Sequence, residues 1–197
     1  IKNSISYGLA IENGAVPTLS GNTYENNATV PISLARAESV SAIDDTSVFI
    51  NNGDDRIHVP YRYQNVQPTD ITMASPGIPY YFIFNFNTKS GSVFTINPGA
   101  ELQFNTGFGF TANGKLVAEG TAENPIIFTS ATEFPWSFLS FPDDADGGSI
   151  LNHCIIENGG DQVGIYSTQL MTIEASDLTV ENCTFRHSAG DGIFLSN

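Results

Sequence analysis

The residues best suited to chemistry in this sequence are three aspartates in one short acidic turn. The segment P-D-D-A-D-G-G-S places Asp143, Asp144 and Asp146 beside two flexible glycines. Carboxylate and backbone oxygens in such a turn could coordinate Ca²⁺, which prefers oxygen ligands. The segment lacks the distal glutamate of an EF-hand loop, and a solvated acidic turn is the alternative interpretation. The three aspartates are therefore the metal site that the sequence offers, with Ca²⁺ as its ion.

The two cysteines form a second candidate group. Cys154 and Cys183 occupy the same place in two similar stretches, H-C-I-I-E-N-G and N-C-T-F-R-H-S. If these stretches are neighbouring strands, the two sulfurs stack within disulfide reach, since paired strands lie ~4.8 Å apart. Small apolar residues commonly stack in repetitive cores. We therefore expect buried free thiols, with a disulfide as the alternative.

Residues that could cleave or bind polysaccharide are sparse. A lyase that abstracts a proton beside a uronate carboxylate usually employs Arg or Lys, and the 7 basic residues of this chain are scattered. Aromatic side chains, which can stack on sugar rings, gather between Tyr61 and Phe86 and between Phe134 and Phe141, although core packing explains them equally. We expect no catalytic and no cofactor-binding residues. A polysaccharide lyase, a hydrolase or a carbohydrate-binding module is the alternative.

The charge of the chain limits its partners. The 21 acidic and 7 basic residues give a formal net charge of −14. This charge disfavours nucleic acid and anionic membrane surfaces, whereas cations and neutral sugars are compatible. No segment approaches the ~18 apolar residues that a membrane helix needs. We therefore expect no nucleic-acid partner and no direct membrane insertion.

The stretch from Val93 to Ser130 indicates the fold that must position these residues. Its apolar residues alternate over short runs, and the runs stop at Asn-Pro-Gly, Asn-Thr-Gly or Asn-Gly. This pattern predicts short strands separated by tight turns. The spacing between the runs leaves no room for a crossover helix, which favours strands that coil around one axis.

Internal repeats support the same architecture. The segment at 182–188 resembles those at 153–159 and 21–27, and at one constant offset it also matches the start of the chain, with Phe185 on Ile1 and Ile193 on Leu9. Repeats of strand, bend, strand and turn are typical of a solenoid whose rungs stack side by side. In the last rung we expect inward side chains on both sides of a bend at 181–182: Leu178, Val180, Cys183 and Phe185.

These patterns predict an all-β, right-handed parallel β-helix, since parallel crossovers are right-handed in nearly all cases. Regular rungs are expected over 1–34 and 77–197. The segment 35–76 is irregular and is expected to hold one or two distorted rungs with a loop, or a seam between two β-helical units. The whole chain is expected to be one continuous solenoid.

Several runs also carry a resemblance to a known group of proteins. The sequences T-I-N-P-G-A-E-L-Q-F, N-G-K-L-V-A-E-G-T-A-E-N-P-I-I-F-T-S and E-N-C-T-F-R-H-S-A-G-D-G-I-F-L resemble the right-handed parallel β-helix repeat proteins of bacterial and archaeal cell surfaces, within the pectate-lyase-like superfamily. The resemblance covers 78–197 well and 1–27 as isolated rungs. It implies an extracellular or cell-surface location, in a group whose functions are diverse.

The expected function is therefore that of a non-catalytic structural or adhesive segment of a surface fibre, sheath or layer. The sequence suggests no amphipathic helix that would cover the open sheet edges at either end. We expect copies of the chain, or adjacent β-helical segments, to meet these edges end to end. Polysaccharide is a further expected partner.

Overall fold

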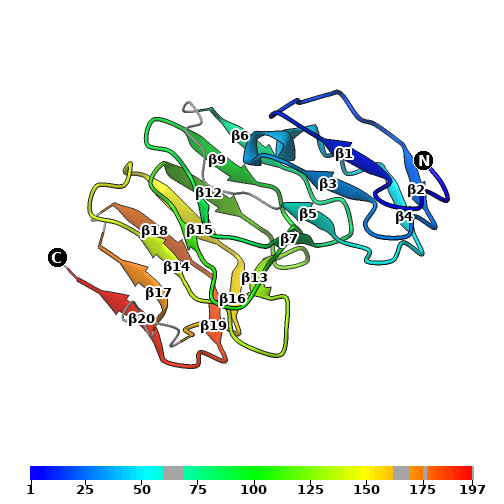
Figure 1. Ribbon diagram of the computed structural model, residues 1–197. Coiled ribbons are helices and arrows are strands. Elements are labelled where there is room, and N and C mark those ends of the chain that lie inside the picture. Colours follow the sequence, from blue (N-terminus) through cyan, green and yellow to red (C-terminus); the bar gives the residue numbers. More distant parts are fainter. Residues whose placement is uncertain (60–68, 162–168, 175–176, 197) are drawn as a thin grey trace.

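The computed structural model describes residues 1–59, 69–161, 169–174 and 177–196. In it the chain is an all-β parallel solenoid of about 7 turns with almost no helix (Figure 1). The two termini lie at opposite ends of the solenoid. The fold expected from the alternating apolar runs is therefore confirmed. Among the described residues, no helix has the length and apolar character needed to cross a membrane.

One sheet, here called the long sheet, takes a strand from every turn of the solenoid. Its eight strands follow the order of the chain: β1 (Leu9–Ile11), β3 (Ile32–Leu34), β5 (Ile57–Val59), β7 (Tyr80–Phe82), β10 (Glu101–Phe104), β13 (Ile126–Ser130), β16 (Cys154–Glu157) and β19 (Thr184–Arg186). Each neighbouring pair of these strands runs parallel.

Two five-stranded sheets form the other faces of the later turns. The second sheet contains β6 (Ile71–Met73), β9 (Val93–Ile96), β12 (Lys115–Glu119), β15 (Ser149–Asn152) and β18 (Leu178–Glu181). The third sheet contains β8 (Phe86–Asn87), β11 (Phe110–Thr111), β14 (Leu139–Phe141), β17 (Gln169–Ile173) and β20 (Asp191–Leu195). A short sheet of β2 (Thr23–Glu25) and β4 (Val48–Ile50) and the 3₁₀ helix η1 (Ala37–Ala42) complete the early turns.

Left-handed residues turn the chain from one sheet to the next. Six of these lie directly after a strand and have positive φ: Asn26, Asn51, His153, Asn158, Asn182 and His187. Asn tolerates this backbone region better than most residues because its short side chain bonds locally. The bend expected at 181–182 is thus present, with Asn182 at φ 52°.

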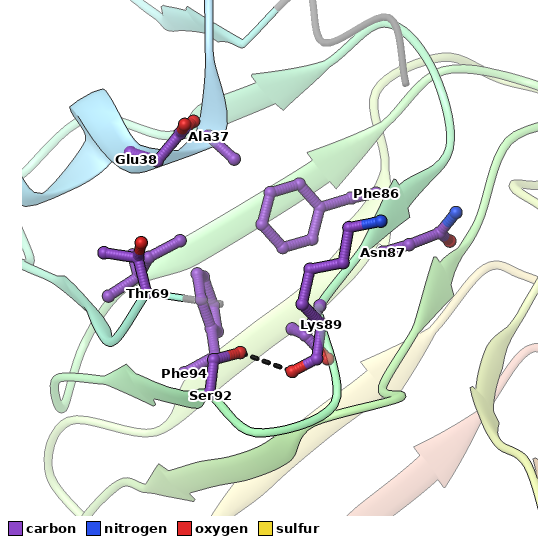
Figure 2. A pocket seen from close by; sticks show the side chains of 10 residues that line it. Ala37, Glu38, Thr69, Phe86, Asn87, Lys89, Ser92 and Phe94 are labelled. Carbon is purple, nitrogen blue, oxygen red and sulfur yellow. Dashed lines mark hydrogen bonds between the residues drawn. The ribbon is translucent and has the colours of Figure 1, made fainter. Parts of the chain in front are cut away.

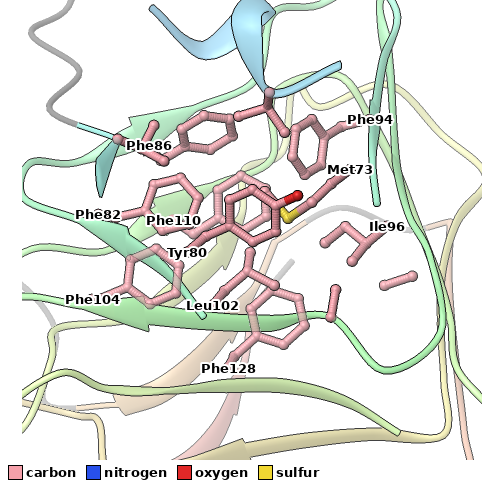
Figure 3. Close-up of a cluster of buried hydrophobic side chains, with 14 of the residues drawn as sticks. Met73, Tyr80, Phe82, Phe86, Phe94, Ile96, Leu102, Phe104, Phe110 and Phe128 are labelled. Carbon is pink, nitrogen blue, oxygen red and sulfur yellow. The ribbon is translucent and has the colours of Figure 1, made fainter. Parts of the chain in front are cut away.

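The core is built from inward side chains that stack from rung to rung. One inward row of the long sheet keeps its register along the whole solenoid: Leu9, Ile32, Ile57, Tyr80, Leu102, Phe128, Ile156 and Phe185. Aromatic rings fill the middle turns (Figure 3). Burial raises the pKa of Tyr80, so its hydroxyl stays neutral and donates a hydrogen bond to the Ala74 carbonyl oxygen at 3.1 Å. The Trp136 ring stacks on Phe104 with centroids 4.6 Å apart.

The predicted inward positions of the last rung are confirmed. Val180 lies in register with Leu151, and Phe185 with Ile156. The outward Thr179 and Thr184 pair with the outward Ile150 and Ile155. A strand expected near Gly164 and Ile165 lies outside the described residues.

The irregular segment 35–76 contains η1, β4, β5 and β6. Here the short sheet ends at β4, and the second sheet begins at β6. The long sheet alone continues across this boundary among the described strands. In the described part of this segment, the faces other than the long sheet therefore change from one sheet to another.

Candidate functional site

The last described rung of the solenoid, formed by β18, β19 and β20, exposes several apolar side chains. Each of the three strands is the last in its sheet, so its outer edge has no strand partner among the described residues. We call this surface the C-terminal end face. Its inward residues include Val180, Phe185, Ile193 and Leu195.

One turn earlier, the residues in the same inward rows are buried. Leu151 and Met171 are completely buried, whereas their partners Val180 and Ile193 are 37% and 43% exposed. Leu195 is 70% exposed. Phe185 is only partly buried, although it packs against the core. The side chains thus continue the core pattern without a further rung to cover them in the described part of the chain.

The opposite end has a different cross-section. The long sheet begins there at β1, and Ile1 to Asn3 bond to the backbone of β2, with Lys2 bridging Glu25. The second and third sheets do not reach this end, because they begin at β6 and β8. Exposed apolar side chains lie here too: Ile1, Ile5, Tyr7 and Val16.

The sequence match between the two ends pairs residues that lie on different faces of the solenoid. The expected equivalence of these residues is therefore wrong. It placed Ile193 on Leu9 and Phe185 on Ile1. In the structure Leu9 and Phe185 both belong to the long sheet, whereas Ile193 belongs to the third sheet. Short strand motifs recur on every face of a solenoid, so a local match does not identify the face.

A polar row that sequence reasoning missed runs along the outer face of the long sheet. Its members follow one another in neighbouring rungs: Ser33, His58, Tyr81, Gln103, Thr129, Glu157 and Arg186. At its end the Arg186 guanidinium pairs with the Glu157 carboxylate. In the sequence, each member of the row is marked only as an outward residue of its own strand. Placing these residues in one row requires the register between neighbouring rungs.

A group of paired polar side chains lies beside His58 in the early part of this row. Asp54 accepts two hydrogen bonds of 2.7 Å from Arg56 and lies 3.1 Å from His58 Nε2. The hydrogen bonds from Arg56 hold the pKa of the Asp54 carboxyl below its usual value. The Arg56 guanidinium also lies 4.1 Å from the ring centroid of Tyr81. Because these groups are already paired with one another, we interpret them as a surface network rather than a reactive centre.

A surface groove of about 390 Å³ lies beside the end of the polar row. Its walls are the loop after β13 and the bends after β16 and β19, and its lining residues are Thr132, Glu133, Phe134, Pro135, Asn158, His187, Ser188 and Ala189. Phe134 is 59% exposed. The Ser130 and Thr132 hydroxyls donate hydrogen bonds to its carbonyl oxygen, and its amide donates to Thr132 Oγ1 at 3.1 Å. The loop therefore holds an apolar ring in solvent next to polar groups.

A second, much smaller cavity lies beneath η1 (Figure 2). Glu38 enters it from η1 and Lys89 from the turn after β8, with Phe86 and Phe94 on its walls. Its volume is about 30 Å³, which suits one or two water molecules rather than a substrate. The Glu38 Oε2 atom is buried without a protein partner among the described residues, and a water molecule there would satisfy it.

The acidic turn proposed for calcium has two different parts. Asp143 and Asp144 are exposed. Asp146 instead accepts hydrogen bonds from Ser90 Oγ at 2.8 Å and from the Gly91 amide at 2.6 Å, which ties its turn to the earlier turn at 89–92. No group of three or more His, Cys, Asp or Glu side chains in the described ranges is arranged to hold a metal ion. Calcium binding at these aspartates stays a prediction, and a cation would compete with Ser90 and Gly91.

The aromatic side chains divide between core and surface. Tyr80, Phe82, Phe86, Trp136 and Phe141 are buried. Tyr61 and Tyr63 lie outside the described residues. Phe134 is the one large aromatic side chain of the second group that the structure leaves mostly exposed.

No family model, no curated protein and no solved structure matches this chain.

Proposed function

We propose that this chain is a rigid, non-catalytic structural segment of an extracellular or cell-surface assembly, of the right-handed β-helix type, in which solenoids stack end to end. The observation that carries the proposal is the C-terminal end face, where the inward rows of the core reach the surface. Contiguous apolar surface beside open strand edges favours pairing with another chain.

Head-to-tail stacking fits the long sheet best. Strands β19 and β1 are the two edges of this one sheet, so placing β19 of one copy against β1 of the next would continue it. Such a contact satisfies backbone N–H and C=O groups and covers Phe185 and Leu195. Because the two surfaces in contact are different, the assembly need not close and can extend into a filament.

A charged residue on the C-terminal end face tests this proposal. We expect the wild-type chain to self-associate as its concentration rises in sedimentation-velocity runs, and Leu195→Asp to remain monomeric, because stacking would bury the new carboxylate. The matched control is Val48→Asp, which changes a 48% exposed side chain on the flank of the solenoid and should associate like the wild type. A wild-type chain that stays monomeric at every concentration would refute end-to-end stacking of this chain.

A second candidate function is binding of neutral sugars in the groove beside Phe134. The supporting observation is the exposed, hydrogen-bond-anchored Phe134 loop next to Asn158 and His187. Aromatic faces stack on sugar rings, and neighbouring polar groups can bond the hydroxyls. The net charge of −14 favours neutral over acidic sugars.

Truncating the Phe134 ring tests this candidate. If wild-type protein binds a neutral oligosaccharide in calorimetric titrations, we expect Phe134→Ala to lower the affinity about tenfold or more, as for a central aromatic anchor. Phe194→Ala is the matched control, because Phe194 is 44% exposed and lies outside the groove. Equal affinities for Phe134→Ala and the wild type would exclude the groove as the sugar site.

A further inference from the structure

We propose that Cys154 and Cys183 form a disulfide under oxidising conditions and thereby link the last rung covalently to the rung before it. Both are free thiols in the structure. The proposal concerns a modification site inside the solenoid and does not depend on end-to-end stacking or on sugar binding.

The register of the long sheet brings the two cysteines together. Strands β16 and β19 run parallel, with Ile155 opposite Thr184. One residue earlier, Cys154 and Cys183 therefore face each other, in a row that begins with Ile126 in the preceding rung. In-register Cα atoms of neighbouring strands lie about 4.8 Å apart, which is within the range of about 4.4–6.8 Å found in disulfides.

The two sulfurs have equivalent surroundings in neighbouring rungs, since each lies beside a carbonyl oxygen of the second sheet in the rung before its own. Cys154 Sγ lies 3.4 Å from the Ala118 carbonyl oxygen, and Cys183 Sγ lies 3.5 Å from that of Leu151. Cys154 is buried, whereas Cys183 is only partly buried. A small oxidant arriving at the C-terminal end face therefore meets Cys183 first.

The two thiols also differ in reactivity. A hydrogen bond from Cys154 lowers the pKa of the Cys183 thiol to about 7, and the same hydrogen bond, together with burial, raises the pKa of Cys154. Since the thiolate is the nucleophile, Cys183 is the attacking group at neutral pH. Cys154 is the resolving thiol, and its partner sulfur is already adjacent.

A small-molecule disulfide such as oxidised glutathione supplies the oxidant. The Cys183 thiolate attacks one of its sulfurs, the S–S bond breaks, and one glutathione leaves as a thiolate that takes up a proton. Cys154 then gives its proton to solvent and attacks the Cys183 sulfur, which releases the second glutathione. Two protein thiols lose two electrons in total, and one glutathione disulfide becomes two glutathione molecules.

The bond would stabilise the last described rung of the solenoid. It closes a loop of about 30 residues, and such closure restricts the unfolded chain. We therefore expect the oxidised chain to melt several degrees above the reduced chain, with the difference lost on adding dithiothreitol.

The test incubates the full chain with oxidised or reduced glutathione, followed by non-reducing peptide mapping and thermal melts. We expect a linked Cys154–Cys183 peptide, loss of both free thiols and the higher melting temperature. Cys154→Ser should accumulate a mixed disulfide with glutathione at Cys183, because the resolving thiol is missing. Folded Cys183→Ser should keep Cys154 unmodified, because that thiol is buried.

Three results would overturn the proposal. They are persistence of both free thiols in the wild type, a stable glutathione adduct in the wild type without the linked peptide, and a linked chain that melts below the reduced one. All three can be measured on monomeric protein, so a failure of end-to-end stacking leaves this test intact.

Discussion

Replacing Phe110 by Ala is expected to lower the free energy of unfolding by about 3–5 kcal/mol, the usual cost of truncating a fully buried phenylalanine. Phe110 is completely buried. Its ring centroid lies 5.1 Å from that of Phe86 and 5.8 Å from that of Phe94, and the rings of Phe104 and Phe128 stack nearby (Figure 3). The side chain thus connects all three faces of the middle turns. Its loss leaves a cavity that rigid, stacked strands cannot readily close.

Equilibrium denaturation measures this loss, and two further phenylalanines calibrate it. Phe194→Ala, on the outward side of β20, should cost less than about 1 kcal/mol. Phe185→Ala should lie between the two, because Phe185 is in the inward row but at the open end. A loss for Phe110→Ala no larger than that for Phe194→Ala would show that the aromatic cluster is not the centre of the core.

Replacing Gly114 by Ala is expected to destabilise the chain by about 1–3 kcal/mol or more, because the new methyl group overpacks a backbone contact. A Cβ atom at this position would lie 2.2 Å from the Lys89 carbonyl oxygen and 2.6 Å from that of Ser92. Backbone atoms cannot swing aside as the end of a long side chain can. The turn at 113–114 must therefore separate from the turn at 89–92, which breaks the hydrogen bond from Gly114 N to Thr88 Oγ1.

Gly192→Ala is the matched control for this substitution, since nothing lies within 4 Å of a Cβ atom built there. We expect its midpoint of chemical denaturation to stay close to that of the wild type. Equal stability of the Gly114 and Gly192 variants would mean that the stacked turns are not in close contact.

The sequence predicted the solenoid because its strongest signals are local. The alternation at Phe94 and Ile96, and at Leu102 and Phe104, places these side chains inward, as the structure has them. Turn residues after the runs marked where the chain changes sheet, as at Asn182. Both signals arise within a few residues, so they can be recognised without knowing which rungs are neighbours.

The candidate surfaces needed information that a single sequence does not contain. The polar row joins His58, Tyr81 and Gln103 through strand register, and the loops between the strands differ in length from rung to rung. The same uncertainty produced the wrong match between Ile193 and Leu9. The groove beside Phe134 depends on a loop meeting two bends from later rungs, a contact to which no repeat pattern points.

The interruption of the faces between β4 and β6 also has a mechanical meaning. Across it the long sheet, through the pairing of β5 with β7, is the one sheet that the described residues continue. At this level the turns are joined by one continuous sheet and by the contact of η1 with β6, where the Thr72 amide donates a hydrogen bond to Ser41 Oγ. We therefore expect the first turns to bend relative to the later ones more readily than the later turns, joined by three sheets, bend among themselves.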